Sequence, residues 1–555
     1  MRFQTITTDI LVIGGGLAAL KATHSASESG MEVLVVSKGT ICSGSSFYPL
    51  MEALGCQAPT EDPEDNIRLL EEIRESSFQM HDEELTKIYI DEIRDRVAEL
   101  PAMGIPYRKM QGGRIPCFAK RARDIFIWED WNAIRNKSYA LLKAKDNVRL
   151  MEHCTVIDTI LHDDHIAGAL CIDRQGSLFV ISCRSMILAT GGFGDLFEHN
   201  LNPSDVCGHG HILALDAGAK LVNMEFIQFI PGFMTPRYKV LFSEQILGYC
   251  TQVNDAEGRD LLARYLPSSI TSRQCLDERS KHGPYTSSDI SRYFDIAMMK
   301  EINDTGCEKG FNLSYDPKLL EDKREFISIY VDWIRKEQHI DLLGTKHTIA
   351  PLAQASNGGI VIDVRCATGV NGLYAAGEVA GSLHGADRHG GNASGSCLVF
   401  GHRSGAYASQ WAKSCDRQAI NTSIARKALT ERFEHHRPNR IDADELIKEI
   451  RHLMWYHANV VRNERDLVYA KDRIRQLYED FNPATHMSNP KTIGMAVKAD
   501  HAARLSMILL ECMLLRKESR GPHYREDYPE KNDRSYARRL MVQSTADKDI
   551  EYRFT

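Results

Sequence analysis

The sequence predicts an α/β protein built on a Rossmann-type domain, and three observations predict this class. Residues 9–38 follow the order strand, glycine-rich turn, helix and strand, which makes one βαβ unit. Residues 231–344 are irregular and punctuated by proline and glycine, as expected of an inserted domain. Beyond the polar stretch 437–440 the pattern is helical almost to Arg516. We therefore expect an inserted α+β domain and a C-terminal helical domain beside the Rossmann-type domain.

The other expected elements follow in chain order. We expect charged helical structure at 62–103 and strands at 148–160, 166–172, 185–189, 359–363 and 372–376. A chain of 555 residues is too long for one compact core. Because the first domain is interrupted by the insertion, we predict it to be discontinuous. The predicted domains are residues 1–230 together with 346–415, residues 231–345, and residues 416–555.

Composition excludes several classes of function. The formal net charge of −7 gives no electrostatic reason to expect nucleic acid or an anionic membrane as a partner. No apolar run approaches the roughly 20 residues that a membrane-spanning helix needs. No signal-peptide pattern opens the chain. We therefore expect no direct membrane insertion and a cytoplasmic location.

A dinucleotide fingerprint lies in the first βαβ unit. Residues 14–19, Gly-Gly-Gly-Leu-Ala-Ala, have the form G-x-G-x-x-G/A between a strand and a helix. Gly14 permits a tight turn, Gly16 lets the backbone approach a pyrophosphate, and Ala19 lets the helix pack on the strand. The phosphates would meet unpaired N–H groups at the helix N-terminus, beside Leu17 and Ala18. After the second strand, Ser37 and Lys38 replace the usual acidic residue, and a serine hydroxyl can still bond a ribose.

Two later segments favour FAD over NAD as the cofactor. Ala189, Thr190 and Gly191 end one predicted strand with small residues, and Glu378 follows another. Glu378 is placed to accept hydrogen bonds from sugar-like hydroxyls. A nicotinamide enzyme has no need of these distant contacts, whereas FAD stretches across the whole domain.

We expect no metal site in this chain. The 14 cysteines form no C-x-x-C pair, which argues against a zinc ribbon, a c-type haem or an iron–sulfur cluster. His209 and His211 form an H-x-H pair, but no carboxylate or cysteine stands at metal-ligand spacing. We interpret the pair as part of a loop near the cofactor.

With these segments the chain resembles the succinate dehydrogenase/fumarate reductase flavoprotein family, which includes L-aspartate oxidase. The resemblance covers essentially the whole length and continues in residues 224–229, 384–388, 390–392 and 518–527. It implies an FAD domain, an inserted capping domain and a C-terminal helical domain. It also implies hydride transfer between the flavin and a carbon next to a carboxylate. Since no cluster is expected here, electrons would pass through a partner subunit, a soluble carrier or oxygen, with an iron–sulfur, ferredoxin-like protein or subunit favoured by analogy.

The resemblance also indicates how FAD is held. Family members that carry FAD covalently have a histidine in the loop after the second strand, whereas residues 42–47 here are Cys-Ser-Gly-Ser-Ser-Phe. We therefore predict non-covalent FAD. The further cofactor-binding residues that we expect are Ser43, Gly44, Ser45, Asn392, Ala393 and Ser394.

The substrate site departs from the family pattern. By the alignment, Ile230 and Gln354 replace two histidines that bind dicarboxylates, and Leu247 replaces a proton-shuttling arginine. Arg388, the family's carboxylate-binding arginine, and Glu244 remain. The predicted substrate-binding residues are Arg388, His384, Ser243, Glu244, Gln354, Leu247 and Ile230, and the predicted catalytic residues are Arg388, Glu244 and Tyr249.

These replacements predict a different substrate. A dianion in a closed site needs several donors, and each charge-assisted bond contributes about 1.5–3 kcal/mol. One arginine suits one carboxylate, and Ile230 and Leu247 indicate an apolar wall beside it. We therefore expect a small, partly apolar carboxylate rather than fumarate or succinate. Alternatively the alignment slips, and the missing cation is Arg237, Lys239 or Arg259.

Three rival functions stay open. The first is a true fumarate reductase, succinate dehydrogenase or L-aspartate oxidase. The second resembles the adenylylsulfate reductase flavoprotein, one segment of which is similar to residues 236–239. The third is a catalytically silent FAD-binding subunit.

Overall fold

A parallel sheet forms the centre of the protein. The structure, a computed structural model, describes residues 3–48, 50, 55–112, 114–418, 420, 422–433, 437–545 and 547–555. The strand order is β18-β11-β2-β3-β7, and every neighbouring pair is parallel. The strands are β2 (Ile10–Ile13), β3 (Val33–Val36), β7 (Val148–Met151), β11 (Ser185–Leu188) and β18 (Leu373–Ala375). Such a sheet is covered on both faces, which explains why its strands are continuous apolar runs.

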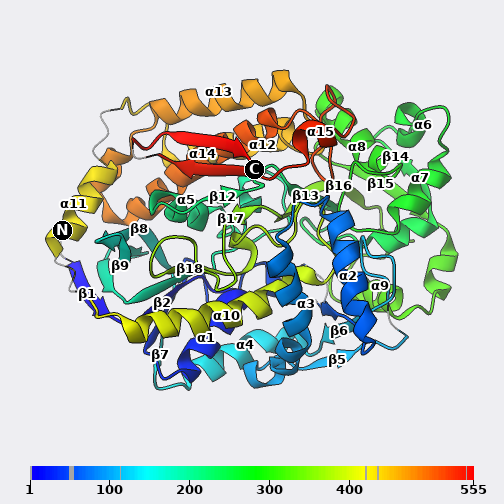
Figure 1. Cartoon of the computed structure of the whole chain (residues 1–555). Coiled ribbons are helices and arrows are strands. Elements are labelled where there is room, and N and C mark those ends of the chain that lie inside the picture. Colours follow the sequence, from blue (N-terminus) through cyan, green and yellow to red (C-terminus); the bar gives the residue numbers. More distant parts are fainter. Residues whose placement is uncertain are drawn as a thin grey trace.

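Two long helices pack together on this sheet. Helix α1 (Leu17–Glu28) connects β2 to β3, and helix α10 (Asn392–Ser414) lies beside it although it follows much later in the chain (Figure 1). Glycines of α10 make this close approach possible. A Cβ at Gly405 would lie 2.4 Å from the Ala22 carbonyl oxygen, and one at Gly401 would lie 2.9 Å from that of Ala18.

Two smaller sheets complete this part of the chain. One has the order β1-β10-β9-β8 and the other the order β4-β6-β5. Their strands are β1 (Phe3–Thr7), β4 (Gly55–Ala58), β5 (Tyr107–Lys109), β6 (Asp124–Trp128), β8 (Cys154–His162), β9 (His165–Asp173) and β10 (Leu178–Ser182). The accompanying helices are α2 (Pro63–Ser76), α3 (Glu83–Ala98), α4 (Trp131–Lys143) and α5 (His209–Asp216).

Two of the predicted stretches each contain a turn between two elements. The charged stretch 62–103 contains α2 and α3, because Phe78 and Gln79 adopt left-handed backbone angles (φ 53° and 61°) and Asp82 caps the second helix. The predicted strand 148–160 contains β7 and β8, with His153 at φ 56° between them.

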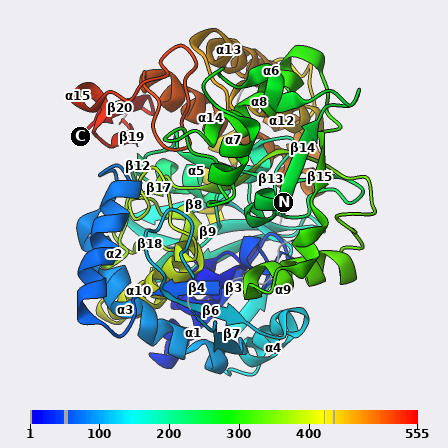
Figure 2. The same ribbon diagram turned by 90° about the vertical axis from the view of Figure 1, so that its right-hand side faces the viewer.

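The inserted segment and the residues that flank it form an antiparallel sheet in the order β13-β16-β15-β14, which extends beyond the expected bounds 231–345 on both sides. Its strands are β13 (Ile227–Thr235), β14 (Cys250–Asn254), β15 (Phe311–Tyr315) and β16 (Thr348–Ser356). Its helices are α6 (Leu261–Tyr265), α7 (Ser272–Arg279), α8 (Arg292–Thr305) and α9 (Glu325–Lys336). Figure 2 shows this segment, in green, at one side of the parallel sheet. The expected α+β character is confirmed.

The C-terminal part is mainly helical, as expected. Its helices are α11 (Thr422–Phe433), α12 (Ala443–His457), α13 (Glu464–Asp480), α14 (Pro490–Leu515) and the short α15 (Asp533–Tyr536). The chain ends in a hairpin of β19 (Leu540–Ser544) and β20 (Ile550–Phe554), which pairs with β12 (Leu221–Val222) and, through it, β17 (Gly359–Ile360). No helix within the described ranges has the length and apolar character needed to cross a membrane.

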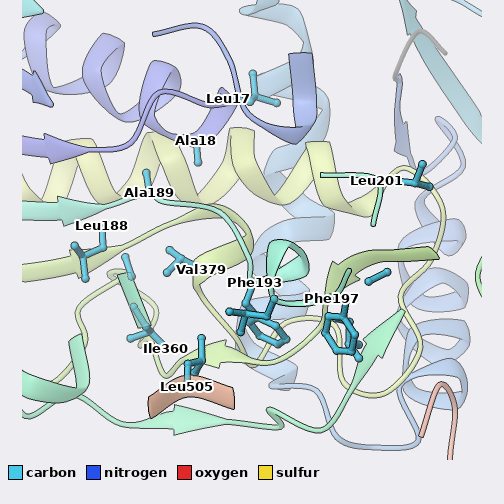
Figure 3. Packing of buried hydrophobic residues seen from close by; sticks show 14 of the residues in the cluster. Leu17, Ala18, Leu188, Ala189, Phe193, Phe197, Leu201, Ile360, Val379 and Leu505 are labelled. Carbon is cyan, nitrogen blue, oxygen red and sulfur yellow. The ribbon is translucent and has the colours of Figure 1, made fainter. Parts of the chain in front are cut away.

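The hydrophobic core joins these parts. Figure 3 shows Leu188 and Ala189 at the end of β11, with Phe193 and Leu505 of α14 in the same cluster. Leu505 also packs closely against Gly208, the residue before α5, because a Cβ at Gly208 would lie 2.0 Å from the Leu505 side chain. The C-terminal helices therefore support the edge of the sheet at which the parallel strands end.

Candidate cofactor and substrate site

The glycine turn after β2 has the geometry that the fingerprint predicts. Gly14 has φ 136°, and a Cβ there would lie 2.1 Å from the Ala189 carbonyl oxygen, so glycine is required. Gly16 is the N-cap of α1, and none of the described side chains caps this helix end. The helix therefore presents unpaired N–H groups, which favour a phosphate. Ala19 is buried, in keeping with its predicted packing role.

A cavity of about 820 Å³ surrounds this turn, and we call it the cofactor cavity. It contains most of the predicted cofactor-binding residues. Its lining includes Gly14, Gly16, Leu17, Ala18, Ser37, Lys38, Ser43, Gly44, Ser45, Ala189, Thr190, Gly191 and Glu378, and also Thr155, Val156, Asp205 and His209. The glycine turn, the uncapped helix end and the distant Glu378 all face one cavity. These residues fit an extended dinucleotide such as FAD.

A second cavity of about 780 Å³, the inner cavity, adjoins the first. The two cavities share Ser45, Ser46, Glu378 and Cys397. The inner cavity brings together Arg388, His384 and Gln354 of the predicted substrate site and Ala393 and Ser394 of the predicted cofactor site. Asn392 is not in its lining, and the Asn392 Oδ1 accepts hydrogen bonds from the Gln57 amide and the Tyr89 hydroxyl.

Arg388 is buried and has few partners. Its Nε donates to the Gln228 Oε1 at 3.2 Å, the one hydrogen bond that this guanidinium makes with described residues. Burial lowers the pKa of Arg388, and the nearby Glu378 carboxylate opposes that shift. The Gln228 Nε2 and the Gln354 Oε1 are buried and unpaired within the described chain. Unpaired buried polar atoms are rare in folded proteins, so this cluster fits a site that binds a polar ligand.

Two other side chains decide the charge of the inner cavity. Burial first, and then the Arg388 charge, hold the pKa of His384 well below its ordinary range, so its imidazole is neutral at neutral pH. Burial raises the pKa of Glu378, whose Oε1 accepts a hydrogen bond from the Ser356 amide at 2.9 Å. The inner cavity therefore combines one buried cation with neutral donors and one carboxyl group.

The remaining predicted substrate residues lie outside the inner cavity lining. Leu247 is fully buried, and Ser243 is buried with its hydroxyl unpaired among described atoms. Tyr249 faces an outer cavity of about 2240 Å³, lined also by residues 114–115, 280–282 and 324–326, and donates to the Asp322 Oδ2 at 2.6 Å. The roles assigned to these residues stay predictions.

Two predicted residues, Ile230 and Glu244, meet beside Gly283, which follows His282 of the outer cavity lining. A Cβ at Gly283 would lie 3.1 Å from the Ile230 Cδ1 and 3.2 Å from the Glu244 Oε2, so the three residues meet there. Glu244 is buried and accepts a hydrogen bond from the Arg114 Nη2 at 3.1 Å. The Cys117 thiol also donates to Glu244. Arg114 and Cys117 carried no sequence signal, because their loop contains no motif and meets Glu244 only in the folded chain.

The alternative cations have partners elsewhere. Arg237 donates to the Glu337 carbonyl oxygen, Lys239 donates to the Asn200 Oδ1, and Arg259 pairs with Asp255. None of the three lines the inner cavity. His209 and His211 were wrongly expected in a loop, since α5 begins at His209 after Gly208 turns the chain at φ 76°. His209 does line the cofactor cavity.

Comparisons with known proteins agree with this geometry. The family described as "FAD binding domain" matches residues 9–394, and that described as "Fumarate reductase flavoprotein C-term" matches residues 447–554. One component of the fumarate reductase (CoM/CoB) from Methanothermobacter marburgensis is 27% identical, with 96% of each chain covered. L-aspartate oxidase from Streptomyces coelicolor is 26% identical, covering 98% of this chain and 93% of its own.

A solved quinol–fumarate reductase has the same fold. It superposes with a TM-score of 0.81 at 20% identity, covering 100% of this chain and 98% of its own. Together with the two family matches, this establishes FAD as the cofactor and oxidation–reduction as the class of reaction. The chain belongs to the succinate dehydrogenase/fumarate reductase family of FAD-dependent flavoproteins.

Proposed function

We propose that this flavoenzyme oxidises or reduces a small, partly apolar compound that carries one carboxylate. The observation that carries the proposal is the buried Arg388, held by Gln228 and facing the inner cavity. Among the described residues of that lining, Arg388 has the one cationic side chain. A buried guanidinium binds a carboxylate strongly because both charges are removed from water.

The same lining disfavours a second carboxylate. Glu378 is the acidic group of the inner cavity, and the neutral His384 offers a hydrogen bond without a charge. A dicarboxylate would therefore leave one negative charge without a cationic partner in a buried site, which is costly. Ile230 and Leu247 stand where the family pattern has polar groups, in keeping with a less polar substrate.

Each part of the site has a separate task in this reaction. When bound, FAD supplies the two-electron chemistry. The glycine turn and the N-terminus of α1 would hold its pyrophosphate, and Glu378 would accept hydrogen bonds from its sugar-like hydroxyls. Arg388 orients the substrate carboxylate, so that the reacting carbon is fixed in the inner cavity. The buried walls exclude water and so strengthen these contacts.

We propose that the electron partner is an iron–sulfur, ferredoxin-like protein or subunit. The cysteines form no cluster motif, and no group of three or more metal-ligating side chains occurs in the described parts of the chain. Electrons that reach or leave the flavin therefore need another carrier.

The test is a flavin titration without oxygen. The purified holoprotein is reduced with dithionite and mixed with unsaturated monocarboxylates, fumarate or adenylylsulfate. We expect a monocarboxylate to reoxidise the flavin fastest. An Arg388→Lys variant is the matched control, because it keeps the charge but loses the planar fork of donors. If no compound reoxidises or reduces the flavin, the alternative of a catalytically silent FAD-binding protein gains support.

Fumarate reduction is the second candidate. It is favoured by the name of the Methanothermobacter relative, a fumarate reductase component that aligns along almost the whole chain. His384 would then donate to the second carboxylate. Faster reoxidation by fumarate than by any monocarboxylate would decide for this candidate. Reoxidation by adenylylsulfate, with release of sulfite and AMP, would decide for chemistry like that of adenylylsulfate reductase.

A further inference from the structure

Three segments of the chain meet at Asp387, the residue before Arg388. The Asp387 Oδ2 accepts a hydrogen bond from the Thr286 hydroxyl of the inserted segment at 2.7 Å. The Asp387 amide donates to the Ser76 carbonyl oxygen, at the end of α2, at 3.2 Å. A Cβ at Gly521, in the C-terminal part, would lie 3.2 Å from the Asp387 Cγ. Asp387 is therefore enclosed, and its exposed fraction is 3%.

A loop of the inserted segment, residues 286–288, is held at this junction from two sides, and we call it the junction loop. Its first residue is bonded to Asp387. The Ser287 amide donates to the Gly521 carbonyl oxygen at 2.7 Å. The Asp387 carboxyl thus connects the junction loop directly to the loop that carries Arg388.

No described cation compensates the charge that Asp387 would carry if it ionised. The Asp387 Oδ1 is buried and unpaired within the described chain. The charged side chains of the segments packed around it have other partners. They are Arg388 with Gln228, Asp289 with His282, Arg292 with the Ser287 carbonyl oxygen, Arg520 with Glu518 and Glu75 with Lys120. A buried carboxylate without a cationic partner is costly, so the site favours the neutral carboxyl.

The neutral carboxyl is the form present at neutral pH. Burial raises the pKa of Asp387 to about 8, the Thr286 hydroxyl opposes that shift, and the Asp289 charge adds to it. A neutral carboxyl can donate its own proton to the Thr286 hydroxyl oxygen. The Thr286 hydroxyl, which lies 3.0 Å from the Ser288 hydroxyl oxygen, then donates to Ser288. Neutral Asp387 therefore extends a chain of hydrogen bonds into the junction loop.

We propose that neutral Asp387 is a positioning residue for Arg388, because it holds the junction loop against the loop that carries the arginine. This inference rests on the proposed function, which gives Arg388 its task of binding a carboxylate. An ionised Asp387 needs water, and water can reach it only when the junction loop moves away. That movement would free the backbone beside Arg388, so that the guanidinium would no longer be fixed at the inner cavity. Fewer molecules are then competent to bind substrate, which raises KM and leaves kcat unchanged.

The contact between Asp387 and the junction loop should weaken as the pH rises. The pKa of Asp387 is about 8 with the contact closed, whereas an exposed aspartate has a pKa of about 3.9. The contact is therefore most stable below the lower value, and opening becomes about tenfold easier for each pH unit between the two values. Asparagine has the same shape and cannot ionise, so Asp387→Asn should keep the contact throughout this range.

Hydrogen exchange of the Ser287 amide measures the opening directly, in the holoprotein without substrate. After correction for the intrinsic exchange rate, protection of this amide in the wild type should fall about tenfold per pH unit between about pH 5 and pH 7. Asp387→Asn should show no such fall. The matched control is Asp163→Asn, at a side chain that is 83% exposed, which should behave as the wild type does. The same pH dependence in the wild type and in Asp387→Asn would overturn the proposal, whatever compound the enzyme acts on.

Steady-state kinetics with the best carboxylate of the panel test the link to binding. The ratio of the wild-type KM to that of Asp387→Asn should increase from about pH 6 to pH 8, with equal kcat. Asp387→Ala, which removes the contact at every pH, should have a raised KM at both values. A constant KM ratio would show that the contact does not position Arg388. If hydrogen exchange behaves as expected but no carboxylate is turned over, the proposed function fails instead, and Asp387 has no part in carboxylate binding.

Discussion

The Arg388 guanidinium is held by the side-chain oxygen of Gln228, which belongs to strand β13 of the inserted segment, 160 residues away in the chain. Arg388 itself precedes α10 of the cofactor-binding part. Arg388, the proposed carboxylate-binding group, is therefore oriented by a residue of a strand in the antiparallel sheet. Any movement of β13 would change the direction of the Arg388 donors.

Removing Arg388 should damage the enzyme severely. With one cation in the described inner lining, we expect Arg388→Ala to lose about 3 kcal/mol or more of transition-state stabilisation, about 100-fold or more in kcat/KM. Steady-state kinetics with the best substrate measure this loss. Gln228→Ala should show a smaller loss because the cation remains. Unchanged kinetics in Arg388→Ala would show that the site does not bind carboxylates.

FAD should be released intact when the protein is denatured. Residues 42–47 contain no histidine, and Ser43, Gly44 and Ser45 of this loop line the cofactor cavity. Acid precipitation followed by chromatography of the supernatant should recover all of the yellow colour as FAD. Flavin that stays with the pellet would mean that another side chain forms a covalent bond.

Substitutions at two glycines of the turn should have different effects. A Cβ at Gly16 would meet only the Ser43 oxygen, at 3.5 Å, so Gly16→Val should fold but lose FAD by filling the space for the pyrophosphate. Gly14→Ala should instead destabilise the fold, because its Cβ would lie 2.1 Å from the Ala189 oxygen. FAD content and thermal unfolding of the two variants separate these effects. If the Gly16→Val variant binds FAD normally, the pyrophosphate must lie elsewhere.

The fold was largely predictable because its signals are local. A strand, three glycines and a helix follow one another within residues 9–28, so periodicity alone indicates the βαβ unit. The position of the turn between α2 and α3 has no glycine signal in the sequence, because two non-glycine residues, Phe78 and Gln79, adopt left-handed angles. The terminal strands β19 and β20 were missed, since they complete a sheet with β12 from the middle of the chain.

The site was only partly predictable, for a related physical reason. Arg388, His384 and Gln354 come from segments with a recognisable pattern, and the inner cavity brings them together. Arg114 and Cys117 meet Glu244 across 130 and 127 residues of chain. Such proximity depends on how the inserted segment packs against the loop that carries Arg114 and Cys117. The spacing of residues along the chain does not indicate this packing.

A buried histidine pair links the cofactor cavity to the C-terminal helices. His209 donates its Nε2–H to the Val156 carbonyl oxygen at 2.6 Å, so its Nδ1 accepts from the Nδ1–H of His501 at 2.9 Å. Arg432 then donates to the His501 Nε2. Both imidazoles are therefore neutral, and neither can add a proton without losing a partner.

This pair should make the protein sensitive to acid. Burial, and then the Lys38 charge, lower the pKa of His209 to about 3, and burial holds that of His501 well below its ordinary value of 6.5. When the pKa of a histidine is lower in the folded than in the unfolded protein, the unfolded state binds a proton more readily. The fold is then most stable at a pH above the unfolded-state pKa, and the free energy of unfolding decreases as the pH falls below that pKa. Each histidine should therefore cost about 1.4 kcal/mol of unfolding free energy per pH unit below about 6.5. Thermal unfolding followed between pH 7 and pH 5 should fall less steeply in His501→Gln than in wild type. Equal slopes in the two proteins would show that protons enter the pair without unfolding it.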